Sequence, residues 1–337
     1  MKKIRNQTGY SIILIICFVT IITIVFISCN NGSTNKNVDI VSVRLKWFHQ
    51  AQFAGLYIAE DMGFYRAEGL NVELRPGGQD FSAVKLVAAG SEDFGIAGAD
   101  EILIAREKGM PLVAIAVIFQ KSPVCFFSKK DSGIKSPYDF VGRRVAMQYG
   151  TNVRNEYVAM MRKLGVDMSK VIEVPSRFDM QQFFEGKVDV WNGYVINERL
   201  AAEEHGFNVN LICPSEYGID MYSDTLFTTE KMIMNRPDVV RKMVKATIEG
   251  WKSALADREY TVKAVLKRDS RLNAEHERRM LDAEADLIAA REVNQHRIGW
   301  MDKQVWESMQ LTLASIGILR NNSFDVRDVY TNVFLSH

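Results

Sequence analysis

Short runs of β-branched and aliphatic residues alternate with segments of helical periodicity along most of this chain. Such alternation predicts βαβ units, in which strands build parallel sheets and helices cover both faces. The strand-like runs lie at 38–46, 71–74, 94–97, 112–119, 124–128, 144–148, 171–174, 188–191 and 209–213. The helix-like segments between them lie at 53–65, 81–89, 101–108, 153–164, 179–185 and 197–205. The predicted fold class is therefore α/β.

These segments fall into two series, followed by a mostly helical part from residue 231 onward. The first series ends with the run at 124–128 and the second begins with the run at 144–148. We expect each series to form one lobe, with the helical tail folding back on the first. A chain of 337 residues is long enough for two domains of ordinary size. Ligands of open α/β sheets bind beyond the carboxyl ends of the strands, so two such lobes predict a cleft between them.

The N-terminal segment has the pattern of a secretory signal. A positively charged start precedes an apolar run at 10–27, then Ser28 and Cys29, and then a polar stretch. The pattern resembles the signal of a bacterial lipoprotein, in which the cysteine is lipidated. We predict a signal peptide at 1–28, a lipid on Cys29 and a flexible linker at 29–37. The alternative is an uncleaved anchor, because about 18 apolar residues can just span a bilayer. Either leader places the body outside the cytoplasm.

Charge and cysteine content exclude several classes of function. The formal net charge is +1, so the chain has no basic field for nucleic acid. The four cysteines show no zinc-type spacing with histidine, and we expect neither a metal nor a cofactor. Cys125 and Cys213 are far apart in the body of the chain. A disulfide between them and two separately buried thiols both fit the sequence.

An ordered set of motifs covers about residues 41–226. Residues 47–59 read WFHQAQFAGLYIA, followed by GFY, EGLNVE, AGSEDFGI, GRRV and GKVDV. The set resembles the family of solute-binding proteins related to thiamin-pyrimidine synthases. The resemblance implies a two-lobe type II periplasmic-binding-protein fold, with the helical C-terminal tail packed on the first lobe. It places the first lobe at 38–124 and 223–337 and the second at 125–222, with crossovers near 123–127 and 219–226.

Aromatic residues are predicted on both sides of the cleft. Trp47 ends the first strand, and Trp191 and Tyr194 end a strand of the second series, so they can sandwich a flat ring. Polar residues at helix starts and in small-residue turns can satisfy ring nitrogens and carbonyls. The predicted ligand-binding residues are Trp47, His49, Gln50, Gly98, Asp100, Tyr149, Thr151, Asn152, Trp191, Tyr194 and Glu198.

Several of these residues have a second interpretation. Trp47 also fits a core position, and His49 fits a surface or capping position. Thr151 or Asn152 fits a helix N-cap. Glu198 either accepts from an exocyclic amine of the ligand or is an acidic residue in the first turn of a helix.

The family that the chain resembles includes binders of formylaminopyrimidine, a thiamin pyrimidine precursor, and proteins assigned to riboflavin, nitrate or sulfonate uptake. The predicted site lacks a convergent Arg/Lys cluster, which argues against small anions. We therefore expect a planar heterocycle, with formylaminopyrimidine first and riboflavin second. The resemblance also implies an ABC-transporter permease and ATPase as partners, and we expect a monomer tethered to the membrane through its lipid.

The enzyme alternative comes from the synthases of the same family. Those synthases carry a cofactor-bearing lysine before the aspartate of the Gly-x-x-Asp element, where this chain has Ser91 and Glu92. Their sacrificial histidine falls near Glu101, and their cysteine-rich iron-binding run has no counterpart. With neither a Schiff-base lysine nor a metal-binding run, we expect a binding protein and not an enzyme.

Overall fold

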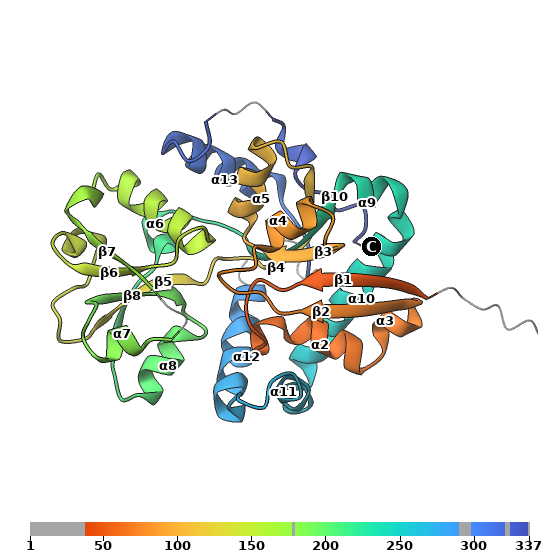
Figure 1. The fold of residues 1–337 in the computed structure, drawn as a ribbon, viewed down its shortest axis with the longest axis horizontal. Helices are drawn as coiled ribbons and strands as arrows, with labels where there is room; N and C mark the ends of the chain where they lie inside the picture. The colour runs from red at the N-terminus through yellow and green to blue at the C-terminus, as the bar shows by residue number, and fades with distance from the viewer. Residues whose placement is uncertain (1–37, 177–178, 290–297, 321–323, 336–337) are drawn as a thin grey trace, which may run out of the picture. The chain divides into compact units, whose positions relative to one another are not determined.

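The computed structural model describes residues 38–176, 179–289, 298–320 and 324–335. The chain divides into residues 1–38 and 39–337, and all the strands belong to the second unit. They form two five-stranded sheets, and Figure 1 shows the helices that accompany each. The predicted signal peptide, the linker and Cys29 lie outside the described residues. Within the described ranges, no helix combines the length and apolarity needed to span a membrane.

The first sheet has the strand order β2-β1-β3-β10-β4. Strand β1 runs parallel to β2 and β3, whereas β10 runs antiparallel to β3 and β4. All eight residues of β4 are buried, as expected for a strand covered on both faces. The strands are β1 (Asp39–Arg44), β2 (Leu70–Arg75), β3 (Phe94–Ala97), β4 (Leu112–Phe119) and β10 (Ser223–Thr229).

The second sheet has the order β7-β6-β8-β5-β9. Strand β6 runs parallel to β7 and β8, and β5 runs antiparallel to β8 and β9. The strands are β5 (Val124–Lys129), β6 (Arg144–Met147), β7 (Ile172–Pro175), β8 (Val190–Tyr194) and β9 (Val209–Ile212).

Both sheets are mixed, which corrects the expectation of parallel sheets. Strands β5 and β10 are the first strands after the chain passes from one sheet to the other. They follow no crossover helix within their own sheet, so nothing imposes a parallel partner on them. Strand β10 was not among the predicted strands, and it overlaps the segment 219–226, where the resemblance placed a crossover.

The helices agree with the predicted segments to within a few residues. The short helices of the first half are η1 (Ala51–Phe53), α2 (Ala54–Asp61), α3 (Phe64–Ala67), α4 (Ala83–Ala88) and α5 (Ala99–Glu107). Those beside the second sheet are α6 (Asn152–Lys163), α7 (Gln181–Phe184) and α8 (Glu198–Glu204). The C-terminal helices are α9 (Glu230–Asn235), α10 (Pro237–Ala256), α11 (Arg258–Leu266), α12 (Ala274–Ile288) and α13 (Lys303–Ser315). Single 3-10 turns are η2 (Pro137–Phe140), η3 (Met168–Lys170), η4 (Pro214–Tyr217) and η5 (Val326–Asp328).

The helical tail packs on the first sheet and its helices, as predicted. Helix α10 lies against α2, where Gly55 and Gly250 allow the two backbones to approach closely. A side chain at Gly55 would collide with the Trp251 ring, and one at Gly250 would collide with the Gly55 carbonyl. Trp251 itself is 1% exposed and belongs to the main core.

The second sheet has a smaller core of its own, and it contains the disulfide. Cys125 on β5 and Cys213 after β9 are bonded to each other, which decides between the two alternatives that the sequence left open. The bond joins residues 88 positions apart, so it closes a long loop of the second sheet.

Candidate functional site: a cleft between the two sheets

The candidate site is a cleft lined by segments that follow strands of both sheets. This is where open α/β sheets bind ligands, because loops and helix starts converge beyond the strand ends. The first-sheet side supplies Lys46, Trp47, Gln50, Gln52, Gly78, Gln79, Phe81, Ser82, Ala83, Val84, Ile96, Ala97 and Glu101. The second-sheet side supplies Gln148, Gly150, Thr151, Asn152, Val153, Gly193, Tyr194, Asn197 and Glu198.

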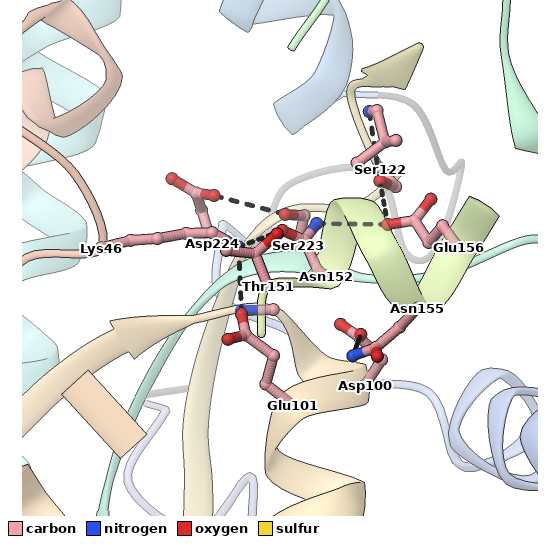
Figure 2. Close-up of polar contacts among 12 residues, drawn as sticks. Lys46, Asp100, Glu101, Ser122, Thr151, Asn152, Asn155, Glu156, Ser223 and Asp224 are labelled. Atoms are coloured by element: carbon pink, nitrogen blue, oxygen red, sulfur yellow. Dashed lines mark hydrogen bonds and ion pairs between the residues drawn. The ribbon is translucent and has the colours of Figure 1, made fainter. Parts of the chain in front are cut away.

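Lys46 lines the cleft and contacts residues of both sides (Figure 2). Its Nζ lies 3.2 Å from Glu101 Oε2 and donates to Asn152 Oδ1 at 2.8 Å. It also lies 5.4 Å from the centroid of the Tyr194 ring. Burial by itself would lower the pKa of Lys46, but Tyr194, Glu101 and Asp224 together hold that pKa above its ordinary value. The side chain therefore stays charged at neutral pH.

A chain of hydrogen bonds leads from Asn152 to Asp224 on β10. Asn152 Nδ2 donates to the Tyr194 hydroxyl at 3.2 Å, and that hydroxyl lies 2.9 Å from Ser223 Oγ. Ser223 donates to Asp224 Oδ1 at 3.3 Å, and Gln52 Nε2 donates to Asp224 Oδ2 at 2.7 Å. These bonds fix the orientation of the Tyr194 ring and of the Gln52 amide, both of which line the cleft.

Asp224 is held in an uncommon backbone conformation. Its φ is +45°, and no other non-glycine residue in the described ranges has a positive φ. The residue is 2% exposed, and burial raises the pKa of its carboxyl to about 6 although Lys46 acts in the opposite direction. Such backbone strain persists only where the surroundings hold a residue firmly, and here the hydrogen-bonded side chains of Gln52, Ser223 and Tyr194 do so.

A further buried polar contact joins α5 to α6, and others hold the start of α6 (Figure 2). Asn155 Nδ2 donates to Asp100 Oδ2 at 2.7 Å. Glu156 Oε1 accepts from Ser122 Oγ at 2.7 Å and from Asn152 Nδ2 at 3.2 Å. Burial, together with the neighbouring Asp100, raises the pKa of Glu156 to about 8, so this carboxyl is mostly protonated at neutral pH. These bonds hold Asn152, at the start of α6, in position beside Lys46.

The two carboxylates that line the cleft already accept hydrogen bonds from the protein. Glu101 Oε2 accepts from the backbone N–H of Gly98 at 2.9 Å. Glu198 Oε2 accepts from the backbone N–H of Tyr194 at 2.7 Å, and its Oε1 accepts from Asn197 at 3.3 Å. Burial raises the pKa of Glu198 to about 7. Glu198 thus ties the start of α8 to the end of β8 as well as lining the cleft.

Six of the predicted ligand-binding residues come together at this cleft. They are Trp47, Gln50, Thr151, Asn152, Tyr194 and Glu198. Trp47 is half-buried, and Tyr194 is 8% exposed. The two aromatic side chains come from opposite sides of the cleft, as the sequence predicted.

The other five predicted residues do not line the cleft. His49 Nδ1 contacts the Tyr57 hydroxyl at 3.0 Å, and Tyr149 is exposed, with its hydroxyl donating to Glu173 at 2.9 Å. Trp191 is 1% exposed in the smaller core, because strand alternation turns it away from the face that Tyr194 occupies.

Gly98 and Asp100 stand at the start of α5 and are not among the lining residues. A side chain at Gly98 would collide with the side chains of Asp100 and Asn152, so this position has no room for anything larger. Asp100 is completely buried against α6. The small-residue turn therefore serves close packing between α5 and α6.

Several lining residues were missed by the sequence analysis. They are Lys46, Gln52, Gln79, Phe81, Glu101, Gln148 and Asn197. Lys46 and Gln148 stand at the ends of predicted strands, so the rule that strand ends build sites would have found both if applied to every strand. Gln79 and Phe81 lie between β2 and α4, where no sequence pattern marks a position near the ligand.

The lining combines aromatic faces with many side-chain amides, which suits a flat ring with hydrogen-bonding edges. In the described ranges, no group of three or more His, Cys, Asp or Glu side chains is arranged to hold a metal ion.

We compared the chain with a family model and with known proteins. The model of the NMT1/THI5-like family matches residues 50–260. The riboflavin-binding protein RibY of Chloroflexus aurantiacus is 24% identical over 88% of this chain and 86% of its own length. The formylaminopyrimidine-binding protein of Halalkalibacterium halodurans is 23% identical over 83% of this chain and 86% of its own.

A third relative is a 4-amino-5-hydroxymethyl-2-methylpyrimidine phosphate synthase of Legionella pneumophila, 21% identical over 62% of this chain and 67% of its own length. Among solved structures, the alkanesulfonate-binding protein SsuA of Xanthomonas axonopodis pv. citri has a TM-score of 0.67. It is 16% identical and covers 87% of this chain and 98% of its own. This likeness shows the periplasmic-binding-protein fold.

Proposed function

The chain belongs to the NMT1/THI5-like family, and from that premise we propose that it is the extracytoplasmic solute-binding component of an ABC importer. Its solute is a planar heterocyclic nutrient. The observation that carries the proposal is the cleft between the two sheets, with Trp47 on one side and Tyr194 on the other. A ring bound between them would contact aromatic faces while its edges meet side-chain amides.

Two relatives bind riboflavin and formylaminopyrimidine, and these are the two candidate ligands of this chain. Both contain a flat ring system, and both offer ring nitrogens and exocyclic groups to amide side chains. The two relatives cover most of this chain and most of their own lengths, so each is aligned across both sheets.

Enzymatic synthesis of a pyrimidine is the alternative of a different class, because synthases are among the relatives. Glu92, which with Ser91 stands at the position of the synthase lysine, is 5% exposed, and its carboxylate pairs with Arg44 and Arg75. Glu101, near the position of the synthase histidine, pairs with Lys46. At the positions of both the synthase lysine and the synthase histidine, the side chain of this protein is held in an ion pair. This supports a binding protein and not an enzyme.

The protein is anchored through a lipid on Cys29, following removal of residues 1–28. This part of the proposal is supported by the leader pattern alone. Intact mass spectrometry of the chain extracted from membranes tests it. We expect a mature chain that begins with a lipidated Cys29, and retention of residues 1–28 would contradict the proposal.

Binding is accompanied by closure of two lobes, with β1–β4, β10 and the tail in one and β5–β9 in the other. A ligand held by both lobes favours the closed arrangement through its additional contacts. Because the ligand binds only the folded protein, it should also raise the melting temperature.

Calorimetric titration of residues 38–337 tests the class of ligand. We expect riboflavin or formylaminopyrimidine to bind with one site per chain and a dissociation constant of about 1 μM or below, equivalent to about −8 kcal/mol. Taurine, an aliphatic sulfonate, is the control ligand, because the alkanesulfonate-binding protein SsuA shares the fold of this chain. If taurine binds and neither heterocycle does, the proposal is wrong.

A further inference from the structure

Asp224 ends a chain of hydrogen bonds that begins at Gln50 in the lining of the cleft. Gln50 Nε2 donates to Gln52 Oε1 at 2.6 Å, and Gln52 Nε2 donates to Asp224 Oδ2 at 2.7 Å. Gln50 and Gln52 lie at the start of η1, whereas Asp224 lies on β10, 172 positions after Gln52. All three side chains are buried, but only the two glutamines line the cleft.

The direction of this chain is set at Asp224. A glutamine amide carries a donor at one end and an acceptor at the other, so each amide can in principle turn either way. An ionised carboxylate can only accept. Gln52 must therefore present its Nε2 to Asp224, which turns its Oε1 toward Gln50. Gln50 must in turn present its Nε2 to Gln52.

The surroundings of Asp224 favour an ionised carboxylate. The Ser223 hydroxyl donates to Oδ1 at 3.3 Å, and the Tyr194 hydroxyl donates to the same oxygen at 3.5 Å. Burial raises the pKa of Asp224 to about 6, with Lys46 acting in the opposite direction, so the carboxyl is mostly ionised at neutral pH. Aspartate also adopts a φ of +45° more readily than most residues other than glycine. It thus fits this backbone conformation and supplies a group that only accepts.

The consequence for a solute appears at Gln50. The bond to Gln52 uses Nε2 of Gln50, so Oε1 takes no part in the chain. If the chain ran the other way, this oxygen would accept from Gln52, and Gln50 would offer only N–H groups to the cleft. The oxygen suits the N–H groups that a flavin ring and an aminopyrimidine both carry.

We propose that Asp224 is a positioning residue, which fixes the direction of the Gln50–Gln52–Asp224 chain and thereby keeps the side-chain oxygen of Gln50 available as an acceptor for the solute. The inference rests on the proposed function and deepens it, because it gives a role in binding to a residue that does not line the cleft. It applies to either candidate ligand.

A double-mutant cycle on positions 50 and 224 tests the inference. In Gln50→Glu the new carboxylate faces the Gln52 oxygen, so two acceptors oppose each other for as long as Asp224 holds Gln52 in its orientation. With Asp224→Asn, the amide introduced at position 224 can donate to Gln52, so Gln52 can turn and donate to position 50. Gln50→Glu should therefore cost less in the Asp224→Asn background than in the wild type.

The cycle is measured by thermal unfolding without ligand and by calorimetric titration with riboflavin and with formylaminopyrimidine. Gln50→Glu should lower the melting temperature and weaken binding by about tenfold or more, and adding Asp224→Asn should recover at least about threefold of that affinity. Asp224→Asn alone should weaken binding by about two- to tenfold, because both directions of the chain become possible. Gln304→Glu, an exposed residue in the first turn of α13, is the control for the added charge and should match the wild type.

The unfolding measurements need no ligand, so they separate the inference from the proposed function. If Gln50→Glu lowers the melting temperature equally in both backgrounds, the inference is wrong whatever the protein binds. If the unfolding cycle is coupled but the wild type binds neither heterocycle, the proposed function and the role of Gln50 in binding fail, whereas the direction of the chain is confirmed.

Two further outcomes concern affinity. If a heterocycle binds the wild type and all three variants equally well, the Gln50 oxygen is not a ligand contact and the inference is wrong. If Gln50→Glu does not fold, Gln50→Met replaces it in the cycle. Its loss of affinity should then be smaller with Asp224→Asn than without, and strictly additive losses contradict the inference.

Discussion

Two tryptophans near strand ends, Trp47 and Trp191, differ in what surrounds them. Trp47 is half-buried and lines the cleft, whereas Trp191 is 1% exposed in the core of the second sheet. The sequence alone suggested a ligand contact for both. Because they are the same residue type in different surroundings, they form a matched pair for testing the aromatic contact.

Trp47→Ala should weaken heterocycle binding by about 1–3 kcal/mol, by analogy with stacking losses at nucleobases. This corresponds to a roughly 5- to 150-fold rise in the dissociation constant. The melting temperature of the unliganded protein should change little, because the side chain is only half-buried. Trp191→Ala should instead lower the free energy of unfolding by about 3–5 kcal/mol, because it leaves a cavity in the core. Calorimetry measures the affinity of both variants, and thermal unfolding measures their stability. An unchanged affinity of Trp47→Ala would show that Trp47 does not contribute to ligand binding.

A more conservative substitution is required to test Tyr194 than to test Trp47. Its hydroxyl bonds Asn152 and Ser223, so removal of the whole side chain would disturb the network as well as the stacking surface. Tyr194→Phe separates the two effects, because it keeps the ring and removes only the hydrogen bonds.

At the scale of elements, α12 connects the helical tail to both sides of the cleft. Glu277 Oε2 accepts from the backbone N–H of Ala51 in η1 at 2.6 Å. On the other side, His276 Nε2 contacts Asn197 Oδ1 at 2.8 Å, and its Nδ1 contacts Glu204 Oε1 at 3.0 Å. Arg279 pairs with Glu203 and, at 3.8 Å, with Glu204. Helix α12 therefore fastens α8, which carries Glu198, to the first-sheet side.

We predict that Arg279→Glu weakens solute binding by about three- to tenfold, because repulsion from α8 disfavours the closed arrangement. Exposed ion pairs contribute little to overall stability, so the melting temperature should change little. The double variant with Glu203→Arg restores opposite charges and should recover most of the affinity. Arg278→Glu is the control on the same helix, since Arg278 pairs within α12 with Glu275 and Asp282. Equal affinities of Arg279→Glu and Arg278→Glu would show that this contact has no part in binding.

At the scale of the whole molecule, most of the order of strands and helices could be predicted from the sequence because apolar periodicity reports local structure directly, but β10 was not among the predicted strands. The mixed character of the sheets could not be predicted, because the direction of β5 and β10 depends on how the chain passes between sheets.

For the site, the motif that begins at Trp47 and the strand that ends at Tyr194 each supplied a residue that lines the cleft. Lys46 was missed because a lysine at the end of a strand is usually a solvated surface residue. Its position in the cleft depends on contacts with Glu101 and Asn152, which are distant from it in sequence.

The central claim is that this molecule holds a flat heterocycle between its two sheets. The most direct test is native mass spectrometry of the full-length protein extracted from cells grown in rich medium, because it presupposes no ligand. We expect one aromatic heterocycle bound per chain, released on denaturation and identified by its mass. A bound non-aromatic solute, such as an aliphatic sulfonate, would contradict it.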